Sequence, residues 1–317
     1  MSPANPHSSE LRGDQLSDYV VVDPPLQSLI CKRINMKNPP LVSFCIPTLN
    51  SEKTIDQCLK SIINQEYPHI EIVIVDGGSS DDTVEVARQY TDNVFFDQGT
   101  LGSARQTAMD HAAGEVLAIF DDDIVIPHRG WLRNVIQYFN YSEKVSTVWP
   151  MVVAPPDAAL TTRLYNNMHK NKVQDHVSKQ RGYHGGGNSL YWRQYMEHIG
   201  GIDRSLRWGE DYDWAKRFKD KGYQVILTYD VLYHNTMSSL REFAKKQYTG
   251  ADSFSKDNFA TTGLSRNEVL YEQFVVGFRG MARGLFREHD YSWMLYPLFV
   301  LIRLIAYGSA FLGRGLR

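Results

Sequence analysis

Three short apolar runs, each closed by polar residues, constrain the fold of this chain more than any other feature. Residues 41–46, 70–75 and 116–120 have the length and composition of strands that are buried on both faces. The segments that follow these runs are Pro47-Thr48-Leu49-Asn50, Asp76-Gly77-Gly78-Ser79 and Asp121-Asp122-Asp123. In an open parallel sheet, ligands bind beyond the carboxyl ends of the strands. We therefore expect these polar segments to meet in one site.

Helical patterns separate the three apolar runs. Residues 52–66 and 102–113 carry the patterns expected of helices, and residues 81–90 begin with the acidic residues favoured in a first helical turn. A further short strand is expected at 94–96. Alternation of strands and helices predicts an α/β fold with a mostly parallel sheet flanked by helices.

The composition excludes some classes of protein. The 317 residues carry a formal net charge of -2, and 43% of them are hydrophobic. The length and the hydrophobic share suit one large domain, or a domain with an appendage. The near-neutral charge argues against a nucleic-acid partner. The cysteines Cys31, Cys45 and Cys58 are odd in number and form no CxxC pair. Together with a start that lacks the pattern of a signal peptide, they favour a reducing, cytoplasmic location.

Three regions are expected along the chain. Residues 1–38 are polar and proline-bearing, with one apolar stretch at Tyr19–Val22, and are expected to form a loosely ordered lead-in. Residues 39–240 contain the alternating pattern and are expected to form the catalytic domain. Residues 241–317 are expected to be largely helical.

The three adjacent carboxylates of Asp121, Asp122 and Asp123 repel one another, so placing them at the end of an apolar strand is costly without a cation. Their hard oxygen atoms suit Mg²⁺ or Mn²⁺ bound together with a diphosphate. An acidic surface turn is the alternative. Asp76 and the glycines after it form either a close-approach site for a nucleotide or a plain turn before a helix.

Two later segments carry polar residues without deciding a role by themselves. Gly185-Gly186-Gly187-Asn188 is a glycine-rich loop, and Asp211 follows Gly209-Glu210 at the start of a helical pattern. A carboxylate at that position is often only a helix cap, but it can serve as a general base if it faces a cleft.

The order of all these pieces resembles glycosyltransferase family 2, whose members have the GT-A fold. The resemblance covers residues 41–235, about two thirds of the chain. It rests on the segments PTLNSEKTIDQCLKSIINQ, EIVIVDGGSSDDT, GSARQTAMDHAAGEVLAIFDDD, GGGNSLYWR, IGGIDRSLRWGEDYDWAKRFKDKGY and LYHN. It implies an inverting transferase that uses a nucleotide sugar and a divalent metal.

The resemblance also implies roles for single residues. Asp76 would pair with the base, usually uracil, and Asp123 would be the direct metal ligand, with Asp121 and His234 as further ligands. Asp211, with Glu210, would supply the general base. The acceptor would lie near Gly187, Asn188 and Trp208. The remaining donor-binding residues would be Pro47, Thr48, Asn50, Glu52, Gly78, Ser79, Arg105 and Asp122.

Departures from the family pattern refine these expectations. Gly77 replaces a second aspartate that is common in the family, which weakens any ribose contact from that position. A general base favours a hydroxyl acceptor, such as a sugar on a growing glycan, because a phosphate acceptor is already ionised. No Gln-x-x-Arg-Trp segment follows Asp211, and similar processive synthases carry one, so one sugar per acceptor is expected.

The C-terminal region combines basic and apolar residues. Arg279, Arg283 and Arg287 recur every four residues, and a long apolar stretch follows at 293–307. Arg303 lies near its centre, at a cost of roughly 2.5–3.5 kcal/mol for insertion into a bilayer. Pro297 interrupts it further. We therefore expect a peripheral helix pair over residues 274–317, with arginines towards lipid headgroups at the cytoplasmic face. A packing or dimerisation element is the alternative.

Other functional classes fit less well. A sugar-nucleotide nucleotidyltransferase would normally open with a glycine-rich, arginine-bearing loop, which Pro47-Thr48-Leu49-Asn50 is not. A non-catalytic glycan-binding scaffold would typically have lost carboxylates at the metal or base position, and this chain keeps both. A dehydrogenase is disfavoured because no GxGxxG follows a strand.

Overall fold

The structure is a computed structural model that describes residues 19–22, 38–178, 187–207, 209–256 and 270–312. One sheet has the strand order β1 (Tyr19–Val22), β9 (Gln224–His234), β7 (Val145–Val153), β8 (Ser189–Trp192), β5 (Val116–Ile119), β2 (Val42–Thr48), β3 (Ile70–Asp76) and β4 (Val94–Phe96), and β6 (Ile124–Val125) pairs with β9. Pairs that include β8, and the β6–β9 pair, are antiparallel; the others are parallel. The predicted mixed α/β fold with a mostly parallel sheet is confirmed.

The elements of the first half follow the predicted alternation. Their bounds are β1 Tyr19–Val22, β2 Val42–Thr48, α2 Ile55–Ile63, β3 Ile70–Asp76, α3 Thr83–Ala87, β4 Val94–Phe96, α4 Leu101–His111, β5 Val116–Ile119, β6 Ile124–Val125, α5 Trp131–Val135 and η1 Ile136–Tyr141.

The second half adds strands to the sheet and then helices. Its elements are β7 Val145–Val153, α6 Leu160–Ser178, β8 Ser189–Trp192, α7 Arg193–His198, α8 Glu210–Asp220, β9 Gln224–His234, α9 Leu240–Lys256, η2 Glu272–Val276, α11 Gly277–Phe286, η3 Tyr291–Leu295 and α12 Tyr296–Leu312.

Both faces of the sheet are covered, as the unbroken apolar runs predict. Phe44 and Ile46 of β2 face a core that includes Leu59 of α2, whereas Cys45 faces a second core that includes Ala108 of α4 and Trp214 of α8. Successive residues of a strand point to opposite faces, which explains this division. The two packed layers fix the carboxyl ends of β2, β3 and β5 relative to one another.

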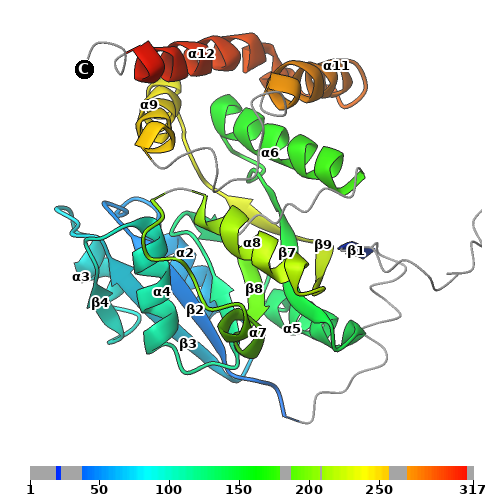
Figure 1. Ribbon diagram of the computed structural model, residues 1–317. Helices are drawn as coiled ribbons and strands as arrows, with labels where there is room; N and C mark the ends of the chain where they lie inside the picture. Colours follow the sequence, from blue (N-terminus) through cyan, green and yellow to red (C-terminus); the bar gives the residue numbers. More distant parts are fainter. Residues whose placement is uncertain (1–18, 23–37, 179–186, 208, 257–269, 313–317) are drawn as a thin grey trace, which may run out of the picture.

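Four helices form a separate layer beyond one end of the sheet, at the top of Figure 1: α6, α9, α11 and α12. They share a core of their own, in which Phe243 of α9 stacks on Phe299 of α12 with ring centroids 3.7 Å apart. The helix α6 also packs against β7, so the layer is joined to the sheet.

One expectation about the lead-in is wrong. Tyr19–Val22 forms β1, which pairs in parallel with Val225–Thr228 of β9, instead of belonging to a loosely ordered segment. The apolar sequence YVVV suits a strand, but its partner lies about 200 residues away in the chain, so local patterning gave no sign of the pairing.

Candidate active site

The polar segments after β2, β3 and β5 lie at one edge of the sheet. Thr48 at the end of β2 is in register with Asp76 at the end of β3, and β5 pairs with the other side of β2 before leading into Asp121. Parallel strands bring their carboxyl ends to the same edge. The structure therefore brings together the three polar segments that were expected to meet in one site.

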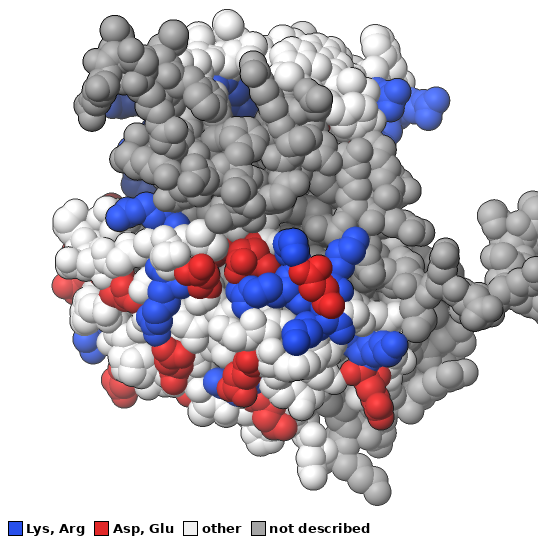
Figure 2. All heavy atoms as spheres, viewed as in Figure 1, with Lys and Arg blue, Asp and Glu red and all other residues white. Residues whose placement is uncertain are grey.

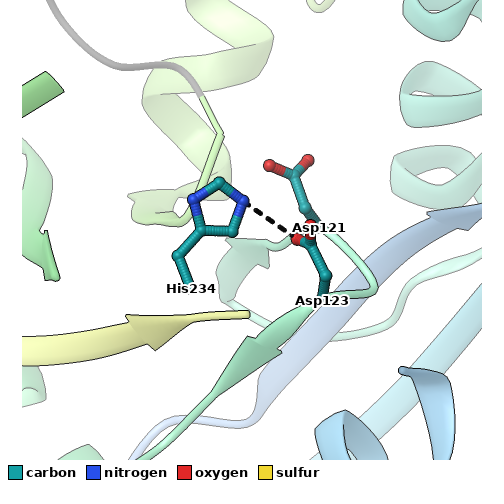
Figure 3. A group of neighbouring side chains, drawn as sticks. All are labelled: Asp121, Asp123 and His234. Carbon is teal, nitrogen blue, oxygen red and sulfur yellow. Dashed lines mark ion pairs between the residues drawn. The ribbon is translucent and has the colours of Figure 1, made fainter. Parts of the chain in front are cut away.

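Asp121, Asp123 and His234 form the centre of this site. One possible ligand atom from each lies within 4.8 Å of the others. His234 comes from β9, whose antiparallel pairing with β6 sets it opposite Ile124, directly after Asp123. Figure 3 shows the imidazole and the two carboxylates facing a common point, with His234 Nε2 3.2 Å from Asp123 Oδ1.

This group of side chains suits a divalent cation. Asp123 Oδ1 is buried, and within the described part of the chain it has no hydrogen bond, only the approach of His234. Burial alone would raise the pKa of Asp123, but the attraction of His234 outweighs it and the pKa falls to about 2. A buried, ionised oxygen without a hydrogen bond is a suitable ligand for a hard cation.

Asp122 points elsewhere. Its carboxylate accepts a hydrogen bond from the hydroxyl of Ser51, at the start of the loop before α2. Burial, followed by repulsion from Asp123, raises the pKa of Asp122 to about 7. The structure therefore separates Asp122 from the outer two aspartates and gives it a contact that braces the loop after β2.

Arg105 is buried beneath the site and holds two acidic groups. Its guanidinium donates to Asp121 Oδ1 at 2.7 Å and to Glu210 Oε1 at 2.5 Å. Arg105 and Glu210 are only 4% and 3% exposed. Glu210, which the sequence analysis grouped with the general base, is thus the buried partner of Arg105. Removing one partner of such a pair would leave a buried charge unpaired, so Glu210 holds Arg105 in place, and Arg105 in turn orients Asp121.

Asn188 and Gly187 also act on Asp121. Asn188 Oδ1 accepts from the backbone N–H of Asp121 at 2.8 Å, and its Nδ2 donates to Asp121 Oδ2 at 3.0 Å. A Cβ on Gly187 would lie 3.1 Å from Arg105 Nη2 and 3.2 Å from Asp121 Oδ2, so the loop passes close to both. These contacts position the carboxylate and differ from the acceptor role expected for Asn188. Trp208 lies outside the described residues.

Asp211 lies in the first turn of α8, directly after Glu210. Its side chain is half-buried, and its charge acts on Arg105 and on Glu210. The helix begins from Gly209, whose φ of 78° is a left-handed conformation that favours glycine. The structure therefore places Asp211 directly after the buried partner of Arg105, on a side chain that is only half-buried.

The loops expected to hold the nucleotide are tied together by Asp76. Its carboxylate accepts from the backbone N–H groups of Gly78 and Ser79 at 2.9 and 2.8 Å, and from the hydroxyls of Thr48 and Ser79. Four hydrogen bonds occupy the capacity of both oxygens. Contact with a base therefore requires a hydroxyl, such as that of Ser79, to turn away.

The other residues assigned to this loop pair lie around Asp76. Asn50, with a φ of 55°, accepts from the backbone N–H of Ser80 at 2.9 Å and donates its own backbone N–H to Ser79. Pro47 is the penultimate residue of β2, and Glu52 is exposed beyond the strand, with its backbone N–H on Asp81. The described contacts thus make a pre-formed rim at the end of β2 and β3.

Two helices that the sequence motifs did not point to reach the same site. In α6, Asn166 donates to the carbonyl of His234 at 3.2 Å, and the ring of Tyr165 lies edge-on to the His234 ring with centroids 6.1 Å apart. In α9, Lys246 lies over the Tyr165 ring at 5.3 Å. No sequence signal marked these residues, because only the packing of the helices brings them to the sheet edge.

The residues that form this site lie in a region that matches a known protein family. Residues 43–243, more than half of the chain, match the family model for Glycosyl transferase family 2. The chain belongs to glycosyltransferase family 2. The predicted membership is therefore confirmed, and the protein is an enzyme of the glycosyltransferase class.

The similar proteins agree with this assignment. This family 2 transferase is 28% identical to glycosyltransferase AglE of Haloferax volcanii over 66% of its own chain and 71% of AglE. It is 33% identical to the GalNAc(5)-diNAcBac-PP-undecaprenol beta-1,3-glucosyltransferase of Campylobacter jejuni, but over 26% of its chain and 30% of that enzyme. The fold is similar to that of the mannosyltransferase PcManGT of Pyrobaculum calidifontis, with a TM-score of 0.57 and 17% identity over 86% and 88% of the two chains.

Proposed function

We propose that this family 2 transferase moves a single sugar from a nucleoside-diphosphate sugar, with UDP preferred, to a hydroxyl of a glycan or lipid-linked glycan. The reaction inverts the anomeric carbon and requires Mn²⁺ or Mg²⁺. The observation that carries the proposal is the convergence of Asp121, Asp123 and His234 at the sheet edge, with Asp211 directly after Glu210, the buried partner of Arg105.

The metal would be held by Asp121, Asp123 and His234. When bound, a divalent cation offsets the negative charge that develops on the leaving diphosphate. Two carboxylates and one imidazole suit Mn²⁺ better than Mg²⁺, which prefers oxygen ligands. The solved structure of PcManGT contains GDP-Man and Mn²⁺, which supports a nucleotide sugar and a metal here.

Asp211 would act as the general base. As the acceptor oxygen forms its bond to the anomeric carbon, Asp211 takes the hydroxyl proton, and the bond from that carbon to the nucleoside diphosphate breaks. One displacement without a covalent intermediate inverts the configuration. Arg105 would act indirectly in this scheme, because its guanidinium is already bound to Asp121 and Glu210.

The acceptor is proposed from chemistry and from relatives. A base is needed only for a neutral hydroxyl, so a sugar hydroxyl is the expected nucleophile. The name of the Campylobacter relative includes a lipid-linked glycan, which supports that class of acceptor. Such acceptors are presented at a membrane, which fits the proposed location at its cytoplasmic face.

A donor screen tests this proposed function. Purified protein with Mn²⁺ or Mg²⁺ is offered UDP- and GDP-sugars together with polyprenyl-linked saccharides, and release of UDP or GDP is measured. Release of UDP that depends on the acceptor is the expected result, with a product of inverted anomeric configuration by NMR. Formation of a nucleotide sugar from a sugar phosphate and a nucleoside triphosphate would instead make the protein a nucleotidyltransferase. If only GDP-sugars are turned over, the proposed preference for UDP is wrong and the donor is a GDP-sugar.

The C-terminal helices would bind the membrane surface. Within the described chain, Tyr291–Ser309 is long and apolar enough to span a bilayer, with a mean hydropathy of 1.3. However, Arg303 turns inward, donating to Gln247 and Gln273 at 3.0 Å. The outward side of α12 carries half-exposed apolar residues, and in Figure 2 the described atoms along the top of the molecule are mostly uncharged. These residues are Leu298, Leu301, Leu304 and Ile305.

The arginine stripe contributes only in part to this surface. Arg283 donates to Asn171 of α6 at 2.6 Å and approaches Glu288, so it is not directed to headgroups as expected. Arg279 on α11 and Arg287 directly after it remain exposed, each next in the chain to an exposed ring, Phe278 or Phe286. An apolar face bordered by these arginines suits a surface of anionic lipid.

Replacing Leu301 and Leu304 together by aspartate is expected to weaken binding to anionic vesicles by more than about tenfold, because burying one leucine contributes roughly 1.5–3 kcal/mol. Co-sedimentation at low and high salt measures this. Ile63→Asp on α2 is the control, since Ile63 is 53% exposed and lies on a different part of the molecule. Wild-type binding should fall as salt rises. Salt-resistant pelleting would indicate insertion, and no pelleting at any salt would favour a dimer surface.

A further inference from the structure

Lys246 of α9 lies outside the sequence motifs, and the charges of Asp123, Asp121 and Asp122 all act on it. Its Nζ lies 5.3 Å from the centroid of the Tyr165 ring, and Tyr165 lies edge-on to His234. Lys246 stays exposed to solvent, and among the described residues it has no ion pair or hydrogen bond. An accessible ammonium group is therefore linked to His234, one of the three possible metal ligands, through the Tyr165 ring.

Two helices fix the place of this ammonium group. Thr162 of α6 donates to the carbonyl of Thr236, just after β9, at 2.6 Å, so α6 and its Tyr165 are tied to the segment that carries His234. On α9, the residues flanking Lys246 pack on α12: Phe243 stacks on Phe299, and Gln247 accepts from Arg303. Lys246 is thus presented by a braced helix and not by a free loop.

The charges at the site show what this group can bind. Arg105 is already paired with Asp121 and Glu210, so its positive charge is largely neutralised by groups of the protein. The phenol of Tyr165 raises the pKa of Lys246. Desolvation lowers that pKa and the charge of Asp123 raises it, so that the net shift is upward and the amine stays protonated. A protonated amine without an ion pair can bind an anion through strong charge-assisted hydrogen bonds.

We propose that Lys246 binds the diphosphate of the nucleotide donor, from the side of the site opposite the sheet. The inference rests on the proposed function and extends it, because it assigns a donor contact to the C-terminal helical layer. The diphosphate gains negative charge as it leaves, and Lys246 would offset part of that charge alongside the cation that Asp121, Asp123 and His234 would hold. The Tyr165 ring limits the directions that the lysine side chain can take.

Binding of UDP and UMP by calorimetry, in Mn²⁺ and again in EDTA, tests the assignment. Lys246→Met should weaken UDP binding by about 10- to 100-fold, the usual effect of losing a hydrogen bond to a charged group. It should weaken UMP binding much less, because UMP lacks the second phosphate. Lys246→Arg should restore most of the affinity for UDP. If the donor screen selects GDP, GDP and GMP replace this pair.

Lys245→Met is the matched control, since Lys245 is the exposed neighbour on the same helix and, among the described contacts, makes none with the Tyr165 ring or with the three aspartates. Unchanged UDP affinity in Lys246→Met, or equal losses for UDP and UMP, would overturn the assignment. A raised KM for the acceptor with unchanged UDP affinity would move the contact to an acceptor phosphate and also overturn it. Absence of any UDP or GDP binding by folded wild-type protein would overturn the proposed function itself.

Discussion

Asp123→Ala should abolish sugar transfer and weaken binding of the nucleotide donor. Asp123 combines a buried carboxylate oxygen that has no hydrogen bond with a 3.2 Å approach to His234, and the substitution removes the central ligand of the three. With the cation lost, the charge on the leaving diphosphate is no longer offset. Donor binding by calorimetry and product formation with added Mn²⁺ measure the two effects.

Chelation and matched variants make this result specific. Excess EDTA should reproduce the loss in wild-type protein, and His234→Ala should lower the affinity for Mn²⁺ while leaving two carboxylate ligands. Asp92→Ala, at an exposed position before β4, should leave activity unchanged. Full activity of wild-type protein in EDTA would contradict a metal-dependent reaction.

Asp211→Asn should leave the fold and donor binding intact and lower turnover by about 10²–10⁴-fold, the usual contribution of a general base. The amide is nearly the same size as the carboxylate but cannot accept the acceptor proton. Because Asp211 is half-buried at the start of α8, the substitution should disturb the helix little. Steady-state rates at saturating donor and acceptor, with the thermal unfolding midpoint as a check on folding, measure the effect.

Asp213→Asn is the comparison for this prediction. Asp213 lies on the same helical turn but is paired with Arg217 at 2.5 Å, so its loss should leave turnover close to that of the wild type. Wild-type turnover in Asp211→Asn together with a large loss in Asp213→Asn would move the base to Asp213. Glu210 is a poor alternative base, because it is 3% exposed and held by Arg105.

The sequence predicted the arrangement of the first half of the sheet because its signals are local. Apolar runs mark β2, β3 and β5, and parallel pairing then brings Thr48, Asp76 and Asp121 to one edge. The same logic could not separate Asp122 from its neighbours. Its contact with Ser51 depends on the turn after β5, and three identical side chains in a row carry no sign of which ones face a ligand.

Contacts between distant segments account for what the sequence did not reveal. Asn188 contacts Asp121 across 67 residues of the chain, and Glu210 contacts Arg105 across 105 residues. The motifs gave no sign of these contacts, so the sequence predicted an acceptor role for Asn188 and a share in the general base for Glu210. Lys246 lacked a signal because it lies beyond the donor motifs, on a helix whose direction is set by α12. Residues held by long-range packing are those that motif spacing cannot locate.

The pairing of β1 with β9 has a consequence for where the folded unit begins. Without Tyr19–Val22, the backbone N–H and C=O groups of Val225–Thr228 would face solvent along one side of β9, the long strand that ends at His234. An uncovered strand edge of that kind is a template for pairing with another chain. The four residues of β1 thus replace part of a long strand edge by the edge of a short strand, which is a poorer template for self-association, although they lie outside the region that matches the family.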